Sequence, residues 1–75
     1  MDDREIQKKI IQIVRENDSN PYGVTKNEVA RIYSQRWGTS RTTIWDYMMD
    51  LIHSGQIELR LVKKQQRALF IGKGK

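Results

Sequence analysis

Apolar residues recur along the chain with two different spacings. Up to Gly55 they repeat every three or four residues, as in helices that bury one side. Beyond Gly55 they alternate with polar residues, which is the pattern of a half-buried β-strand. Turn-forming residues at 17–23 and at Gly38 divide the helical part into three segments. The sequence therefore predicts an α+β fold: three helices followed by a two-stranded hairpin.

The first two helices carry clear start and stop signals. Asp2 and Glu5 form a D-x-x-E cap before the first helix, which we expect to end near Asn17. Its core face is Ile6, Ile10, Ile13 and Val14, with Ile11 at the flank. After a very short strand expected at 22–24, Thr25 and Glu28 form a second capping box. The face of that helix is Val29, Ile32, Tyr33 and Trp37, with Ala30 at its border.

The third helix is predicted at about 40–54, between an N-cap at Ser40 and Gly55. Its core face is Ile44, Tyr47, Met48 and Leu51, and the opposite side is Thr42, Thr43, Asp46, Asp50 and His53. A second apolar line consists of Trp45, Met49 and Ile52. We expect it to pack against the first helix and the hairpin, or to leave Trp45 and Met49 exposed for a second subunit or a DNA sugar edge. Because Gly38 makes the turn before this helix tight, helices two and three must cross steeply, as in a helix-turn-helix.

The hairpin is predicted from the period-two pattern of Ile57, Leu59 and Leu61 and from a returning strand at 67–71. With its tip centred on Lys64-Gln65, Leu59 would face Phe70 and Leu61 would face Ala68. Leu69 and Ile71 would then point outward. We expect one domain over 1–72 and a flexible basic tail at 73–75.

Charge is distributed unevenly. The 75 residues carry a net charge of +5, yet acids and bases balance up to Gly55 and residues 56–75 hold six Lys or Arg against one Glu. A polyanion is the simplest partner for such asymmetry, although solubility alone also explains a basic protein. The chain has no cysteine, which fits a reducing, cytoplasmic setting, and no apolar run long enough for a membrane span or a signal-peptide core.

The third helix and its flanks resemble the winged-helix DNA-binding domains, of the type found in small regulators of bacteria, archaea and their viruses. Residues 40–57 are similar to the Ser-Arg-x-Thr-[Val/Ile] start and Leu-x-x-Gly-x-Ile finish of that family's recognition helix. The matching residues are Ser40, Arg41, Thr43, Ile44, Leu51, Gly55 and Ile57, with one extra residue before the glycine. Val29-Ala30 resembles the Leu-Ala pair of the preceding helix. A longer second helix, and Trp45 and Asp46 in place of small polar or basic residues, depart from the pattern.

This resemblance implies a double-stranded DNA-binding protein and transcriptional regulator, with the third helix in the major groove and the tip at 63–67 on the backbone. The candidate DNA-binding residues are Ser40, Arg41, Thr42, Thr43, Asp46, Lys63, Lys64, Arg67 and Lys26. Arg41 is suited to guanine or phosphate, and Asp46 to the cytosine amino group. The hydroxyl residues also suit a plain helix cap, and the lysines suit an edge strand protected from aggregation.

Other functions have less support in the sequence. With no cysteine, one histidine and no glycine-rich phosphate loop, we expect no enzyme activity, cofactor, metal or small-molecule ligand. Ile11 and the outward Leu69 and Ile71 add apolar surface, from which we expect a homodimer. Two alternatives stay open: a winged-helix module that binds another protein, and a binder of RNA or of DNA without sequence preference.

Overall fold

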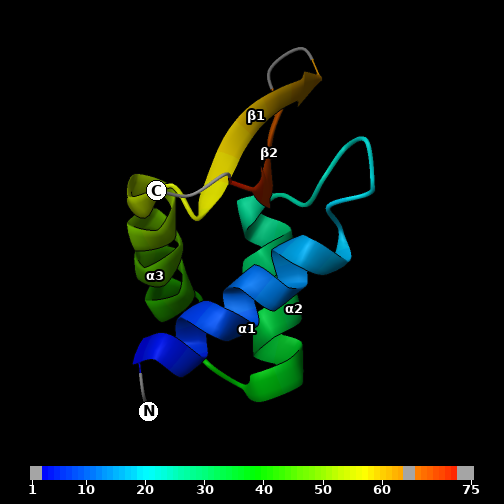
Figure 1. Ribbon diagram of the computed structural model, residues 1–75. Coiled ribbons are helices and arrows are strands. Elements are labelled where there is room, and N and C mark those ends of the chain that lie inside the picture. The colour runs from blue at the N-terminus through cyan, green and yellow to red at the C-terminus, as the bar shows by residue number, and fades with distance from the viewer. Residues whose placement is uncertain (1–2, 64–65, 73–75) are drawn as a thin grey trace.

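The computed structural model describes residues 3–63 and 66–72 (Figure 1). Its elements are α1 (Asp3–Glu16), α2 (Lys26–Trp37), α3 (Arg41–Ser54), β1 (Ile57–Lys63) and β2 (Gln66–Ile71). The two strands are antiparallel, so the predicted α+β class and its winged helix-turn-helix layout are confirmed. The predicted cap residue Asp2, the tip residue Lys64 and the tail at 73–75 lie outside the described residues. No helix in the described part of the chain is both long and apolar enough to cross a bilayer.

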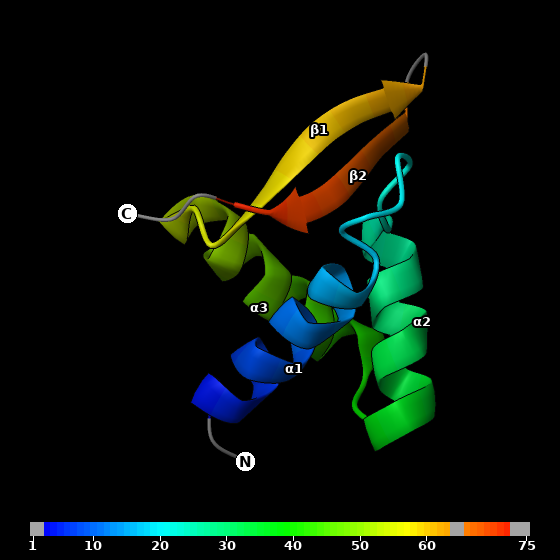
Figure 2. The same cartoon turned by 45° about the vertical axis from the view of Figure 1, so that its right-hand side comes forward.

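Helix α1 packs against both α2 and α3 (Figure 2). Its buried residues are the four that the sequence predicted: Ile6, Ile10, Ile13 and Val14. At the end of α1, the carboxylate of Glu16 accepts hydrogen bonds of 2.9 and 3.2 Å from the guanidinium of Arg36 on α2. These bonds hold the pKa of Glu16 below its usual value. The pair thus ties the two helices together at the surface.

Local capping fixes where α2 and α3 begin and end. The Thr25 side chain accepts from the backbone N–H of Glu28, and the Glu28 side chain accepts from the backbone N–H of Thr25, so the capping box is confirmed. Gly38 ends α2 with φ +76°, a conformation that favours glycine. The Ser34 hydroxyl then donates to the carbonyl of Thr39 over 2.7 Å, which holds the turn into α3.

The core of α3 is Ile44, Met48 and Leu51, all fully buried as predicted. Tyr47, the fourth predicted core residue, is only partly buried and packs at the margin of the core. Its hydroxyl donates to the carboxylate of Asp3 on α1. A phenol needs a hydrogen-bond partner when it leaves water, and this position supplies one without full burial.

The predicted register of the hairpin is wrong by one residue. Leu59 pairs with Leu69 instead of Phe70, and Leu61 pairs with Arg67 instead of Ala68. The cause is a β-bulge between Leu61 and Lys63. Lys63 still pairs with Gln66, as a tip centred on 64–65 requires. The extra residue in β1 then shifts the pairing by one residue in all pairs between the bulge and the base of the hairpin.

Residues 68–70 of β2 are buried on both faces, because one face packs on the core and the segment between α1 and α2 lies against the other. Leu69, predicted to point outward, is fully buried in the core. Its backbone N–H donates to the carbonyl of Val24 over 2.7 Å, so the predicted strand at 22–24 is a single bridge. The backbone N–H of Ile71 donates to the carboxylate of Asp18 over 3.0 Å. These bonds fix the hairpin to the body of the molecule.

Gly23 lies where the chain approaches β2 most closely. Its φ is +59°, and a Cβ atom there would come within 2.8 Å of the Phe70 ring and 3.0 Å of the Ala68 side chain. We expect Gly23→Ala to lower the free energy of unfolding by about 2–4 kcal/mol, through a left-handed conformation and a steric clash together. Urea denaturation measures this loss.

Gly38→Ala is the matched control, because Gly38 also has a positive φ but has nothing within 4 Å of an added Cβ. It should cost only the conformational part, about 1–2 kcal/mol. Equal decreases in the free energy of unfolding in the two variants would show that the close approach of Gly23 to β2 does not constrain which residue can occupy position 23.

Candidate nucleic-acid interface

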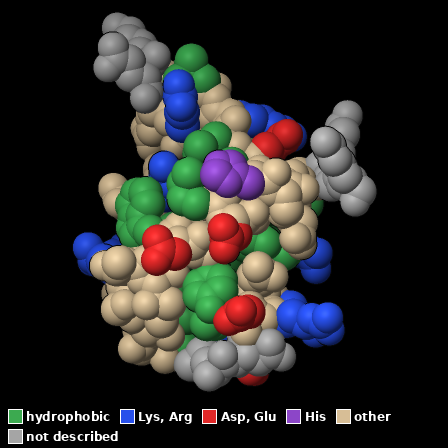
Figure 3. All heavy atoms as spheres, turned by 90° about the vertical axis from the view of Figure 1, so that its left-hand side faces the viewer, with side chains coloured by type: hydrophobic (Ala, Val, Ile, Leu, Met, Phe, Trp, Pro, Cys, Tyr) green, Lys and Arg blue, Asp and Glu red, His purple; other side chains and the backbone are tan. Residues whose placement is uncertain are grey.

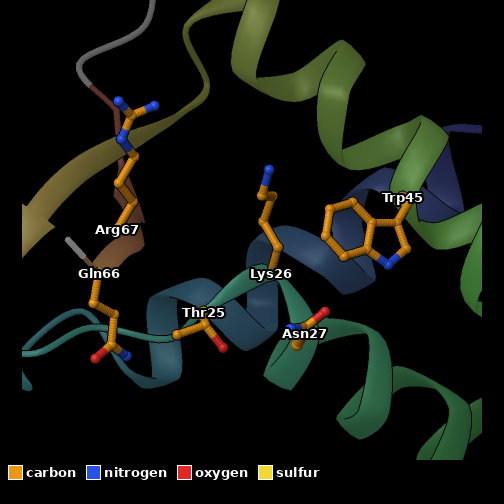
Figure 4. A pocket seen from close by; sticks show the side chains of 6 residues that line it. All are labelled: Thr25, Lys26, Asn27, Trp45, Gln66 and Arg67. Atoms are coloured by element: carbon orange, nitrogen blue, oxygen red, sulfur yellow. The ribbon is translucent and has the colours of Figure 1, made fainter.

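The β1–β2 hairpin, residues 57–71, is called the wing below. A pocket of about 440 Å³ lies between the beginnings of α2 and β2 and the side of α3 that faces the wing (Figure 4). Six residues line it: Thr25, Lys26, Asn27, Trp45, Gln66 and Arg67. They come from three elements that are distant in sequence and meet only through the fold. Two of the nine predicted binding residues, Lys26 and Arg67, therefore share one site with the indole of Trp45.

Within this pocket the Lys26 ammonium lies 4.9 Å from the centroid of the Trp45 ring. An ammonium at this distance is attracted to the electron-rich face of the indole. The contact with the indole also restricts the aliphatic part of the lysine side chain, so the ammonium stays in the pocket.

The cations of the pocket have no acidic partner in the described part of the chain. Ion pairs among residues 3–63 and 66–72 join Lys9 to Glu5, Arg36 to Glu16 and Arg60 to Glu58. Neither Lys26 nor Arg67 takes part in any of these. Positive charge on this side of the molecule is consequently left for a partner to neutralise.

The first turn of α3 shows two kinds of side chain. The Ser40 hydroxyl caps the backbone N–H of Thr43 at 3.4 Å and lies 2.9 Å from the Thr43 hydroxyl. These two hydroxyls thus serve the helix start, as the simpler interpretation of the sequence holds. Arg41 and Thr42 are exposed beside them, and Asp46 is exposed one turn later. Arg41 and Thr42 are therefore the residues at this end of α3 best placed to reach a ligand.

The basic residues of the wing are divided between two places. Arg67 is two residues from Leu69 and lies on the same face of β2, which turns it toward α3 and the pocket. Lys63 instead lies with its ammonium 4.6 Å from the ring of Tyr22, in the segment that precedes α2. The predicted union of the wing cations with α3 is therefore made by Arg67 and not by Lys63.

The outer face of α3 is neither basic nor uniformly polar. Figure 3 shows acidic and apolar side chains gathered around the single histidine of the chain. Asp46, Asp50 and His53 are exposed on α3, and Met49 is 39% exposed beside them, on the side nearer Trp45. Cationic groups flank this face instead of covering it. A phosphate backbone would therefore meet the sides of α3 more favourably than its centre.

Less apolar surface is exposed than the sequence predicted. Leu69 is buried, and Ile11 and Ile71 pack against the core. The large apolar side chains that remain exposed in the described residues are Tyr22, Met49 and Leu61, the last at 65%. The expected homodimer surface is thus reduced to the sides of α3 and the wing.

The sequence named Lys26 as a candidate DNA contact but did not predict that Trp45 lies beside it. Two features of the sequence could have indicated this contact: Lys26 directly follows the N-cap Thr25, and Trp45 lies beside the core residues of the next helix. Comparison with known proteins adds nothing further, since no family model, curated protein or solved structure matches the chain.

Proposed function

We propose that this protein binds double-stranded DNA in the cytoplasm and acts as a transcriptional regulator. The observation that carries the proposal is the pair of uncompensated cations, Lys26 and Arg67, which two different elements bring to one side of α3. Phosphate contacts of this kind fix the register of a protein on a duplex, while contacts to base edges supply sequence preference. Helix α3 is the natural element for the major groove, which is wide enough to admit a helix.

In this arrangement α3 contributes the base contacts from its exposed first turns. Arg41 can form two hydrogen bonds with guanine, and Asp46 can accept one from the cytosine amino group. Burial of Ile44, Met48 and Leu51 keeps the helix rigid behind these side chains. Lys26, Arg67 and the exposed Lys63 supply the contacts to phosphate on either side.

A protein-binding module is the second candidate, and two observations favour it: Leu61 is 65% exposed, and the outer face of α3 carries Asp46 and Asp50. Competition among duplex DNA, RNA and single strands separates the proposed duplex binding from the other alternative, binding of RNA or of DNA without sequence preference. A stable protein partner combined with absent or salt-insensitive DNA binding would favour this candidate.

Neutralising the pocket should weaken binding to every DNA sequence alike. With about five cations on phosphates, the slope of log K against log salt should be about −4 to −5. Lys26→Gln and Arg67→Gln should each make that slope about one unit less steep. Fluorescence anisotropy with a random-sequence duplex measures both. Lys8→Gln, an exposed charge change on α1, is the control and should leave the slope unchanged. Equal effects of all three changes would contradict the assignment of the pocket.

Removing Arg41 should have a different signature. We expect Arg41→Ala to flatten the discrimination between preferred and random duplexes by about tenfold or more, since a good bidentate base contact contributes about that much. Affinity for random DNA should fall much less. Parallel titrations of a selected duplex and a random pool measure the ratio, and an equal loss on both would reject the base-reading role.

A homodimer remains part of the proposal, with the exposed Leu61 of the wing as its apolar contact. Exposed apolar side chains of this size favour an interface. Sedimentation velocity at rising concentration should show a dimer that Leu61→Gln weakens. Monomer alone at the highest concentration would reject the dimer without affecting the DNA proposal.

A further inference from the structure

One apolar edge of α3 lies beside the uncompensated cations. Trp45 and Met49 are four residues apart and therefore share a side of the helix. Trp45 borders the pocket with Lys26 and Arg67, is only partly buried, and is followed by the 39%-exposed Met49. Apart from the indole N–H of Trp45, the part of α3 nearest the phosphate-binding charges thus offers apolar atoms.

An apolar edge in that position has few matching groups on a duplex. The phosphates are charged, and the base edges in the major groove are hydrogen-bond donors and acceptors. Deoxyribose also has an apolar edge, but it belongs to the backbone and is the same in every sequence. Among the bases the exception is thymine, whose C5-methyl group projects into the groove and is the apolar contact that proteins use there. We infer that Trp45 and Met49 are specificity-determining residues that recognise thymine methyl groups. This inference rests on the proposed DNA binding.

The contacts of Trp45 favour such a role. The Lys26 ammonium lies over its ring, so the indole is fixed in orientation and its charged neighbour is directed toward phosphate. On the outer side of the same helix, Asp46 and Asp50 are exposed and repel phosphate. The apolar edge is therefore confined between a cationic side, suited to the backbone, and an acidic side that avoids it. The base edges are therefore the part of the duplex that this apolar edge would contact.

The test removes methyl groups from DNA without changing its sequence. A duplex pool enriched by the protein from random sequences is copied twice, once with thymidine and once with deoxyuridine in its place. Wild-type protein should bind the deoxyuridine copy about fourfold more weakly for each contacted methyl group, since burial of one such group contributes about that factor. Anisotropy titrations at one salt concentration give the ratio of the two dissociation constants.

Variants assign that ratio to particular side chains. Met49→Gln keeps the length of the side chain but removes its apolar end, and it should bring the ratio toward one. Tyr22→Gln is the matched control, because Tyr22 is also an exposed apolar residue but lies in the segment before α2, and it should keep the wild-type ratio. Trp45→Phe should lower the ratio only in part, with circular dichroism confirming that the variant folds.

The outcomes separate the inference from the proposed function. Equal binding of both copies by wild type would overturn the inference and leave DNA binding intact. A ratio that persists in both Met49→Gln and Trp45→Phe would also overturn it, because the methyl effect would then arise from DNA shape. No binding to either copy would reject the proposed function itself.

Discussion

The anchoring of β2 to the segment before α2 governs the position of the wing. One backbone hydrogen bond between Leu69 and Val24, together with the close approach of Gly23 to Phe70 and Ala68, holds the strand beside the start of α2. A two-stranded hairpin is marginally stable by itself in water, so it needs such support. Because α2 begins at Lys26, two residues after Val24, the anchor also brings Arg67 near Lys26. The pocket is a consequence of this constraint.

Charge and burial then divide the surface into distinct regions. Ion pairs neutralise Arg36 between α1 and α2, Lys9 on α1 and Arg60 on the wing. Exposed pairs of this kind contribute little to stability, but they do cancel charge locally. Among the described residues, Lys26 and Arg67 take part in no such pair, and the fold brings them to one pocket. The meeting of two unpaired cations from distant elements identifies the candidate interface better than the net charge of +5 does.

Helix α3 carries basic, apolar and acidic side chains on different sides, which a simple basic recognition helix would not do. Its first turn offers Arg41, its wing-facing edge is apolar, and its outer face carries two aspartates. These features agree if phosphate binding is assigned mainly to α2 and the wing, which leaves α3 to contact base edges. In such an arrangement affinity would come from charges outside the helix, and specificity from side chains on it.

Local patterns in the sequence were sufficient for much of this protein. The three helices, the core residues Ile44, Met48 and Leu51, the capping box at Thr25 and Glu28, and the two-stranded hairpin follow from short-range spacing and backbone chemistry. Such features depend on residues within a turn or two of each other, so a single segment contains the information. Arg41 and the wing cations could be named as candidates for the same reason.

Tertiary structure alone decided the register of the hairpin, the burial of Leu69 and the contact between Lys26 and Trp45. A bulge shifts the cross-strand partners by one residue, so that Leu59 pairs with Leu69. The alternating pattern of apolar and polar residues does not show where such a bulge occurs. Leu69 is buried because β2 packs against the helical core, while its edge pairs with Val24, 45 residues earlier in the chain. Contacts between distant segments depend on how whole elements pack, which short-range spacing does not encode.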